Sequence, residues 1–452
     1  VRMFQDSVIG SASSYATYDS FVQLVVYFLF FITCMGVISK REFAERLCSS
    51  ILLFAFLVTF LGLAQRLVTN ERILWRSFSS SPTAFFGPFI NENHFGGFLG
   101  LTFTFALGLM DYRLNQIERT FAENRGEKPF WQKWFSLINS GVCFLFFLTV
   151  FMLTASFFSL ARVSSAVLLF CCVAYFMVFR VNRRKLRFLL ILPLVVLVGS
   201  FLILWWLGSD SVASGFAARK LADAWAVRFQ AAQQSLALFY ESPFFGTGLA
   251  TYRFVSSKAV SYLINDVSWN HVHNDYVELL VETGFVGFCL WIGAIFLILI
   301  LSVRHAGKNP SYCSRCMVKQ ALLSIFCIGV MEFFDFHLKI PSLALLFTLQ
   351  LAVLFQSGTD RRKSQSFVSS SGEFRSRAGL FKWALLFVGL TTSVLLLVFS
   401  TNQYRAYQLS QVREDRLLHL KKAAQIQSLN AELWYQLGNE YHIASERVDQ
   451  KT

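Results

Sequence analysis

The feature that most constrains this chain is a repeated apolar run, free of charged side chains and long enough to cross a bilayer. A helix needs about 20 predominantly apolar residues to span the hydrocarbon region. The chain is 55% hydrophobic, with 51 Phe and only 15% charged residues, which is more apolar surface than a soluble domain buries. We therefore predict an all-α polytopic membrane protein with about ten transmembrane helices. The expected spans are 21–39, 47–65, 94–110, 137–159, 163–179, 188–207, 285–303, 318–336, 342–357 and 382–400.

The positive charge of the chain predicts its orientation. The net charge is +14, and the lysines and arginines concentrate in short loops between apolar runs. This pattern is typical of the cytoplasmic side of an inner-membrane protein, so nucleic acid is not an expected partner. With this set of spans the basic loops all fall on one side; they are 40–46, 111–136, 180–187, 304–319 and 358–381.

A long polar segment on the opposite, outer side is not predicted to cross the membrane. Residues 208–284 contain the amphipathic stretch FAARKLADAWAVRFQAAQQSLALFY, which suits a helix that lies at the membrane surface. The stretch leads into ESPFFGTGL, in which Pro243, Gly246 and Gly248 predict a turn.

The end of the chain predicts a second region. Residues 401–452 are polar and helical in pattern, and WYQLGNEY fits the opening of a tetratricopeptide repeat. An incidental amphipathic helix is the alternative. We expect a membrane domain over 1–400 and a helical tail over 401–452. Because the chain begins with VRMFQDS, without Met or a signal-peptide pattern, we also expect it to be a fragment that lacks its true N-terminus. One partial repeat cannot bury a core, so we expect either that further repeats are missing or that this helix pair packs on the membrane domain.

Polar and ionisable residues gather on the outer side, at the edges of predicted spans. Such a residue often only extends toward water. Arg162 is different, because it lies between two apolar spans with no acid nearby, which indicates a polar cavity or a ligand. The candidate site residues are Asn91, Asn93 and His94 of NENHFGGFLG, Arg162, Arg228, and His271, His273 and Asn274 of WNHVHNDYVELLVETGFVG.

These residue types favour the handling of an anion. The two arginines can each offer a planar fork of donors to phosphate oxygens. We predict a helix that begins after Asp275 and ends near Gly284, with Asp275 as its N-cap and Glu278 as the capping partner three residues later. His273 would then precede a helix N-terminus, whose partial positive charge favours the neutral imidazole that a general base requires. We expect His271 to point elsewhere.

A metal site is the competing interpretation of the outer histidines, because His-x-His with nearby acids can bind zinc. The outer segments contain neither HExxH nor a paired Asp-x-Asp. Two arginines would also neutralise a diphosphate without a metal, so we expect no metal and no cofactor. Cys313 and Cys316 form a lone CxxC, which is more typical of structural cysteines than of a metal or redox site, and the placement of the cysteines predicts no disulfide framework.

The block HNDYVELLVETGFVG resembles the pattern of O-antigen ligases and the related O-antigen polymerases and O-oligosaccharyltransferases. In that pattern His and Asn are followed by nine residues, Gly, two residues and a second Gly, here His273, Asn274, Gly284 and Gly287. RFQAAQQSLALFYESPFFGTGL resembles the family's R…P-x-x-G-x-G block, FFSLARVSS its Ser-Arg-Gly hairpin, and NENHFGGFL and DFHLKIP two further segments, so that the resemblance covers roughly 85–355. Departures from the family pattern occur at Ala161, Val163 and Ala232.

The resemblance implies a GT-C-like bundle that acts as a metal-independent, inverting glycosyltransferase. Its donor would be a glycan on undecaprenyl diphosphate at the periplasmic face of the bacterial inner membrane. By this analogy Arg162 and Arg228 would bind the diphosphate, and His273 would activate the acceptor hydroxyl. The acceptor varies across the family: lipid A–core in ligases, a glycan end in polymerases, and Ser or Thr in protein oligosaccharyltransferases.

A membrane transporter is the alternative from another class, since intramembrane charge also marks transport pathways. Transport predicts polar residues near the bilayer midplane, broken helices and inverted repeats. In this sequence the polar residues cluster at the outer side, and no inverted repeat is evident. A non-catalytic membrane scaffold is a third possibility. The sequence favours the transferase.

Overall fold

The chain is described by a computed structural model. The described residues are 11–38, 41–67, 86–123, 141–178, 218–260, 270–306, 311–359, 409, 416–426, 436–438 and 440–441. The chain divides into two compact units. One contains Val1–Leu29, Gly248–Thr251 and Ser371–Thr452, and the other, a helical bundle, contains Phe30–Thr247 and Tyr252–Ser370. The predicted domain boundary after residue 400 lies outside the described residues and stays a prediction.

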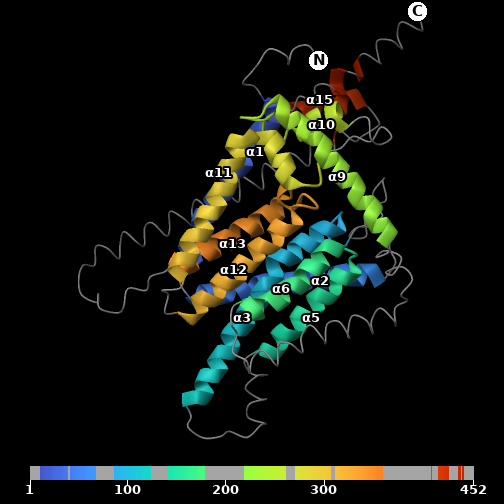
Figure 1. Ribbon diagram of the computed structural model, residues 1–452. Coiled ribbons are helices and arrows are strands. Elements are labelled where there is room, and N and C mark those ends of the chain that lie inside the picture. Colours follow the sequence, from blue (N-terminus) through green and yellow to red (C-terminus); the bar gives the residue numbers. More distant parts are fainter. Residues whose placement is uncertain are drawn as a thin grey trace, which may run out of the picture. The chain divides into compact units, whose positions relative to one another are not determined.

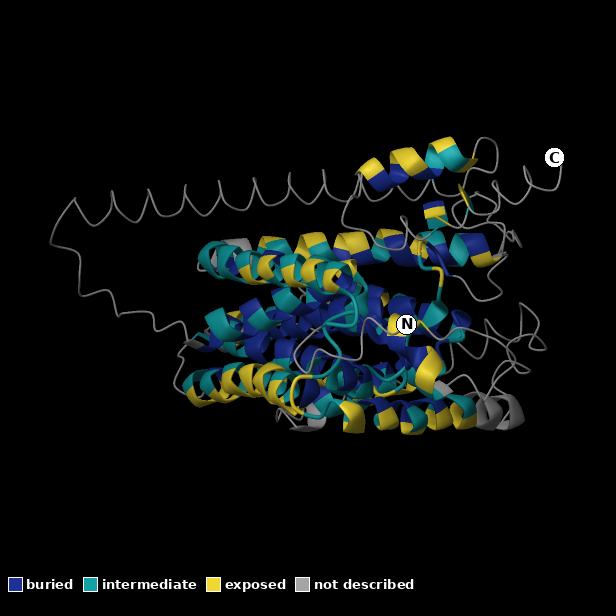
Figure 2. Ribbon diagram, turned by 90° about the horizontal axis from the view of Figure 1, so that it is seen from above, coloured by how far each residue is buried: buried dark blue, intermediate teal, exposed yellow. Residues whose placement is uncertain are grey.

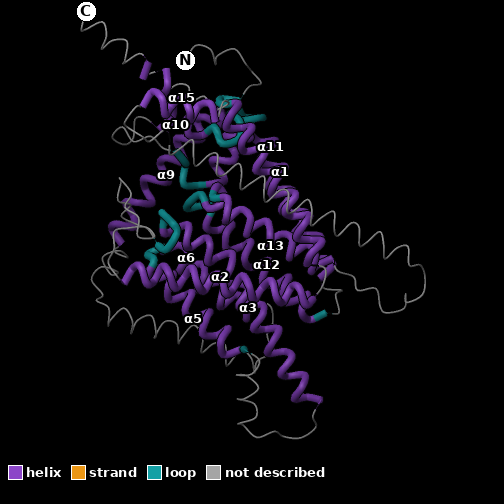
Figure 3. Tube along the Cα trace, turned by 180° about the vertical axis from the view of Figure 1, so that it is seen from behind, coloured by secondary structure: helices purple, strands orange, loops and turns teal. Residues whose placement is uncertain are grey.

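The described part of the chain is built from helices, with an isolated bridge between Phe86 and Phe89. Figure 3 shows the helices in purple, joined by short loops in teal. The helices are α1 (Ser14–Ile38), α2 (Arg41–Leu67), α3 (Glu92–Glu123), α5 (Val142–Phe158), α6 (Arg162–Val178), α9 (Ala218–Glu241), α10 (Tyr252–Val260), α11 (Asp275–Ala306), α12 (Tyr312–Met331), the 3₁₀ turn η2 (His337–Lys339), α13 (Pro341–Thr359) and α15 (Arg416–Ile426).

Six of the described helices are long and apolar enough to cross a membrane: α1, α2, α3, α11, α12 and α13. The helices α5 and α6 are apolar but shorter, which leaves the spans predicted at 137–159 and 163–179 below that length. Those predicted at 188–207 and 382–400 lie outside the described residues. The prediction of an all-α polytopic membrane protein is confirmed.

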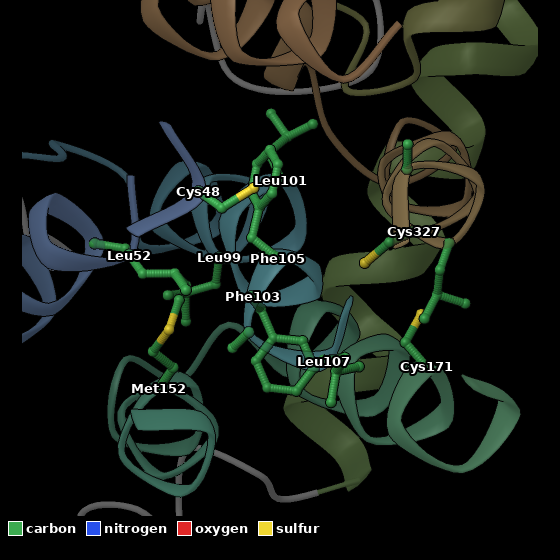
Figure 4. Packing of buried hydrophobic residues seen from close by; sticks show 14 of the residues in the cluster. Cys48, Leu52, Leu99, Leu101, Phe103, Phe105, Leu107, Met152, Cys171 and Cys327 are labelled. Carbon is green, nitrogen blue, oxygen red and sulfur yellow. The ribbon is translucent and has the colours of Figure 1, made fainter. Parts of the chain in front are cut away.

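The centre of the bundle is α3, which packs against α2, α5, α6, α12 and α13. Figure 1 shows α11, α12 and α13 side by side. A helix that is apolar on all sides is expected in the middle of a bundle. Accordingly, successive residues of α3 are fully buried, and Figure 4 shows their packing with Met152 of α5; they are Leu99, Leu101, Phe103, Phe105 and Leu107.

The outer helices show the opposite pattern. The most apolar windows of α1 and α11 are almost entirely unburied within the protein. Figure 2 shows dark blue, buried ribbons in the middle of the bundle and helices with yellow, exposed faces around them. In α11 the exposed side chains include Leu290, Phe296 and Leu297. Apolar side chains on the outside of a bundle are stable where the solvent is lipid.

A bend in α11 divides it into a short first helix and the long apolar span. The bend is at Gly284, where φ is 62° and ψ is −173°, a conformation that only glycine adopts without strain. A Cβ atom at Gly284 would also overlap the carbonyl group of Phe244. The predicted end of a helix near Gly284 is therefore confirmed.

The turn that follows α9 fits against this bend. The backbone N–H of Phe285 donates to the Pro243 carbonyl at 2.8 Å, and that of Thr247 donates to the Val281 carbonyl at 3.0 Å. Gly246, in the turn, has a φ of 70° and lies against the backbone of α11. The spacing of proline and glycine in ESPFFGTGL thus joins α9 to α11 through backbone hydrogen bonds.

The first unit contains α15 among its described elements. Ala423 and Ala424 are buried there with Leu409 packed against them, and Arg416 Nε lies 2.9 Å from Glu440 Oε1. Part of the predicted tetratricopeptide opening, including Trp434, lies outside the described residues. That assignment stays a prediction.

Candidate active site

The site forms where α11 begins. Asn274 is the N-cap, because its Oδ1 accepts the backbone N–H groups of Tyr276 and Val277, each at 3.1 Å. The prediction that Asp275 caps this helix is wrong by one residue. Asp275 is already helical, and its N–H donates to the Glu332 carbonyl at 3.0 Å instead.

His273 lies just ahead of this cap and is held by a carboxylate. Its φ is 58°, a left-handed conformation that is uncommon for a residue other than glycine. Its Nδ1 lies 3.0 Å from Asp335 Oδ1. An ionised carboxylate accepts hydrogen bonds, so it fixes the tautomer that carries its proton on Nδ1 and leaves the lone pair on Nε2. The side chain of His273 is 26% exposed, so part of it is accessible from outside the protein.

Asp335 is the centre of the cluster and is almost fully buried. Asn93 Nδ2 donates to its Oδ2 at 2.6 Å, and the backbone N–H of Phe336 donates to its Oδ1 at 3.0 Å. Burial alone would raise the pKa of Asp335. The hydrogen bond from His273, together with the charges of His273 and Arg228, brings that pKa well below its usual range. The group is therefore ionised at neutral pH.

Arg228 reaches the same carboxylate from α9. Its Nη1 donates to the Phe334 carbonyl at 2.7 Å and lies 3.8 Å from Asp335 Oδ2. Trp225, one turn earlier, packs against Phe334 with the rings tilted by 40° and their centroids 4.9 Å apart. Arg228 remains a third exposed, so its guanidinium can offer further donors to an anion.

The start of α3 completes the cluster. Asn91 Oδ1 accepts the backbone N–H of Asn93 at 2.9 Å, and the buried His94 places its Nε2 4.0 Å from Asp335 Oδ1. Gly97 allows this approach, since a Cβ atom there would overlap the ring of His337. The structure thus brings NENHFGGFLG and the His-Asn block together at Asp335, and their role in one functional site stays a prediction.

Arg162 is the first residue of α6, and its helix packs against the start of α3. Gly96 lies so close to Ser164 that a Cβ atom would overlap the serine side chain. The carboxylate of Glu92 interacts electrostatically with both Arg162 and Arg228. The two predicted arginines are therefore on the same side of the bundle, near the N-terminus of α3.

His271 is held differently from His273. Its Nδ1 lies 2.9 Å from Glu278 Oε1, and its ring stacks on Phe336 at 4.1 Å. The other oxygen of Glu278 accepts the backbone N–H of Val272 at 2.9 Å. His271 thus helps to fix the loop that carries His273, in agreement with its predicted separate direction.

A half-buried lysine connects this loop to η2. Lys339 Nζ lies 3.1 Å from Glu278 Oε1 and 2.7 Å from Glu282 Oε2. Burial alone would lower the pKa of Lys339, but the two glutamates raise it, so the lysine stays charged. Glu282 Oε1 also accepts the backbone N–H of Tyr252 at 3.1 Å, at the start of α10.

Asp335 and Lys339, both in the segment DFHLKIP, are not among the site residues predicted from the sequence. A usable signal was present, because an acid and a lysine lie in a short turn between two apolar spans. Phe336, in the same turn, packs against the rings of His94, His271 and His273. The turn between α12 and α13 is therefore the part of the chain that organises the cluster.

Within the residues that the structure describes, no three His, Cys, Asp or Glu side chains are grouped to bind one metal ion. Cys313 and Cys316 are buried free thiols in α12. The candidate site is instead an ionised carboxylate surrounded by imidazole, guanidinium and amide groups.

Comparison with known protein families gives a match for part of the chain. Residues 147–292 match the family described as O-Antigen ligase, a segment that contains Arg162, Arg228, His273 and Asn274. No curated protein gave a match to the chain. The match supports a membrane-embedded enzyme of the glycosyltransferase type. It also confirms the resemblance that the sequence shows to the O-antigen ligase superfamily, over residues 147–292.

Proposed function

We propose that the protein transfers a glycan from undecaprenyl diphosphate to an acceptor hydroxyl at the periplasmic face of the inner membrane, without a metal and with inversion. One observation carries the proposal. Asp335 binds His273 through Oδ1 and lies beside Arg228 through Oδ2, at 3.0 and 3.8 Å. A base and an anion-binding group are thus held next to each other by one carboxylate.

His273 removes the proton from the acceptor. The acceptor oxygen attacks the anomeric carbon while its proton moves to Nε2 of His273. Asp335 keeps the imidazole in the required tautomer and stabilises the imidazolium that forms. General-base catalysis of this kind contributes about 10²–10⁴-fold to the rate.

Arg228 and Arg162 stabilise the leaving group. As the bond between the anomeric carbon and the diphosphate oxygen breaks, its electron pair stays on that oxygen, and negative charge grows on the diphosphate. Guanidinium groups bind phosphate oxygens with paired, charge-assisted hydrogen bonds. The electrostatic interaction of Glu92 with both arginines supports their placement near one another.

The side of the membrane follows from the loops. The basic segments predicted to be cytoplasmic alternate with the segments that carry the site residues, which supports a site on the opposite side. A lipid-linked donor would reach α9 and the start of α3 from the outer leaflet. The bilayer, the lipid diphosphate and the acceptor are thus the expected partners.

The test is transfer in vitro by the purified protein, with an undecaprenyl-diphosphate-linked glycan, a panel of acceptors and EDTA. We expect activity in EDTA, and loss of product in His273→Ala and Arg228→Ala, by about 10²-fold or more. Glu241→Gln, at the exposed end of α9, is the matched control and should retain wild-type activity.

Three results would contradict the proposal or narrow it. Full activity in His273→Ala rules out the base, and loss of activity in EDTA revives the metal interpretation. The product decides the acceptor class: glycan on lipid A–core identifies a ligase, a longer lipid-linked glycan a polymerase, and modified Ser or Thr a protein oligosaccharyltransferase.

A further inference from the structure

Exposed aromatic side chains gather at the turn that follows α9. Tyr240 is 74% exposed, Phe244 is 66% exposed and Phe245 is 68% exposed. Burying a phenylalanine side chain is worth about 1.5–3 kcal/mol relative to leaving it in water. Residues 240–246, which we call the aromatic turn, therefore present a surface that an apolar environment stabilises and water does not.

The backbone of the aromatic turn is bound to α11, which holds these rings outside the bundle. The carbonyl of Pro243 accepts the backbone N–H of Phe285 at 2.8 Å, and the carbonyl of Phe244 accepts that of Val286 at 3.2 Å. Gly246 lies so close to α11 that a Cβ atom would overlap the helix backbone. The rings are therefore exposed on a hydrogen-bonded backbone and not on a loosely attached loop.

The same hydrogen bonds meet a requirement of a helix that begins inside a bilayer. The first N–H groups of a helix have no partner within that helix, and an unpaired N–H in hydrocarbon is strongly destabilising. The helical backbone of α11 is interrupted at Gly284, and the next two N–H groups, those of Phe285 and Val286, donate to the aromatic turn. The turn thus caps the apolar span at its first residues, where water is not available to do so.

The exposed apolar surface continues from the aromatic turn onto α11. Phe285 is 58% exposed, and Leu290, further along the span, is 70% exposed. Figure 1 shows α9 and α11 meeting at one end of the bundle. Lipid is the solvent that suits the apolar outer face of a membrane-spanning helix. Residues 242–252 contain no charged side chain, so the turn offers a polar partner little and extends the lipid-facing surface of α11.

We propose that the aromatic turn inserts into the bilayer leaflet on the side of the candidate site, with Phe244 and Phe245 in contact with lipid acyl chains. Tyr240 suits the boundary with the headgroups, because its ring is apolar and its hydroxyl is polar. The turn is then an anchor that sets the depth at which the span of α11 begins. It also sets the depth of the short helix before the span, whose N-cap Asn274 adjoins His273.

The test is photo-crosslinking of the full chain in vesicles of phosphatidylethanolamine and phosphatidylglycerol that contain a phospholipid with an alkyne-tagged acyl chain. Phe244 and Phe245 are replaced one at a time by p-benzoylphenylalanine, an aromatic residue that forms a covalent bond with a neighbouring C–H group on irradiation. A dye coupled to the alkyne then measures how much lipid is attached to the protein.

Two further positions serve as matched controls. Leu290 lies on the exposed face of α11, and Arg119 is exposed at the polar end of α3, so the same substitution there reports lipid and water respectively. We expect lipid labelling at Phe244 and Phe245 to be comparable to that at Leu290 and about tenfold above that at Arg119. Size-exclusion chromatography verifies that each variant is folded, and the use of two neighbouring positions keeps the test open if one variant does not fold.

Three outcomes would overturn the inference. A cross-linked dimer would show that a second copy of the chain covers the rings, and a cross-link within one chain would show that another of its segments does. Lipid labelling as low as that at Arg119 would show that the rings face water. Since glycan transfer is not measured, the result holds whether or not the proposed function is correct.

Discussion

Two buried aspartates in the bundle invite comparison. Asp335 lies in the turn between α12 and α13, whereas Asp111 lies within α3, and both are about 1% exposed. Asp111 accepts hydrogen bonds from Tyr312 and Tyr175 at 2.8 and 3.3 Å. Lys319 Nζ lies 3.4 Å away and Cys316 Sγ 3.3 Å away. Each aspartate is thus buried with enough partners to keep it stable.

The difference lies in the partners and in the backbone. The four partners of Asp111 are side chains on regular helices, α6 and α12, and hold three helices together. Asp335 sits on irregular backbone and faces a histidine with left-handed φ and an arginine that is a third exposed. The comparison teaches that burial of a charged group does not by itself indicate a functional site. A functional site is indicated when the partners of that group can exchange protons or bind a ligand.

The largest expected effect is at Asp335. In Asp335→Asn, an amide replaces a carboxylate that accepts from Phe336 N–H on one oxygen and from Asn93 on the other. Either orientation of the amide places an NH₂ group against a donor, and His273 loses the charge that fixes its tautomer. We expect kcat for transfer to fall about 10²-fold or more, with a smaller change in KM.

The matched control is Asp111→Asn, the same substitution in the same bundle. The kcat for transfer is measured for both variants by rapid-quench assays and is normalised to the amount of folded protein. Equal losses of kcat in the two variants would break the comparison, because burial rather than the His273 contact would then explain the loss at Asp335.

The helices and the candidate site residues could be predicted from the sequence more fully than the hydrogen bonds and ion pairs that join those residues. Apolar runs predicted the six long described helices, although the runs at 137–159 and 163–179 correspond to shorter ones. Placing the loops on alternate sides grouped Asn93, His94, Arg228 and His273, which the structure brings around Asp335. Hydropathy is enough for this grouping of residues on one side. Each span crosses the membrane once, so successive loops must lie on alternate sides.

What the sequence could not predict depends on contacts between distant segments. Asn274 and Asp275 are both good N-cap residues, and the choice follows from the bond of Asp275 N–H to the Glu332 carbonyl, 57 positions away along the chain. Lys339 likewise has no partner within its own turn and pairs with two glutamates of α11. Such pairings need the fold.

An intermediate loss of transfer activity is expected at the bend of α11. The short helix before this bend carries the N-cap next to His273, the partner of Asp335. Gly284→Ala adds a Cβ atom against the Phe244 carbonyl at a φ of 62°. The strain costs about 1–3 kcal/mol and shifts the first helix of α11 with its N-cap. We expect a lower melting temperature and a loss of transfer activity of roughly tenfold.

The control for this change is in the same helix. Gly293→Ala meets nothing within 4 Å and should leave activity unchanged while stabilising the helix by up to about 1 kcal/mol. If the two variants lose activity to the same extent, the close approach of α9 and α11 does not position the site.

The smallest effect on transfer is expected at Asp111. Here the predicted loss is in stability, whereas at Asp335 it is in activity. Asp111→Asn weakens the hydrogen bonds from Tyr312 and Tyr175 and leaves Lys319 without its counter-charge. The free energy of unfolding should fall by about 2 kcal/mol, since hydrogen bonds to a charged group are worth more than neutral ones. The rate per folded molecule should stay within about twofold of wild type. Thermal unfolding in detergent measures the first and the normalised transfer assay the second. A rate that falls much further than the folded fraction would show that the two ends of α3 are coupled, so that Asp111 also serves the reaction.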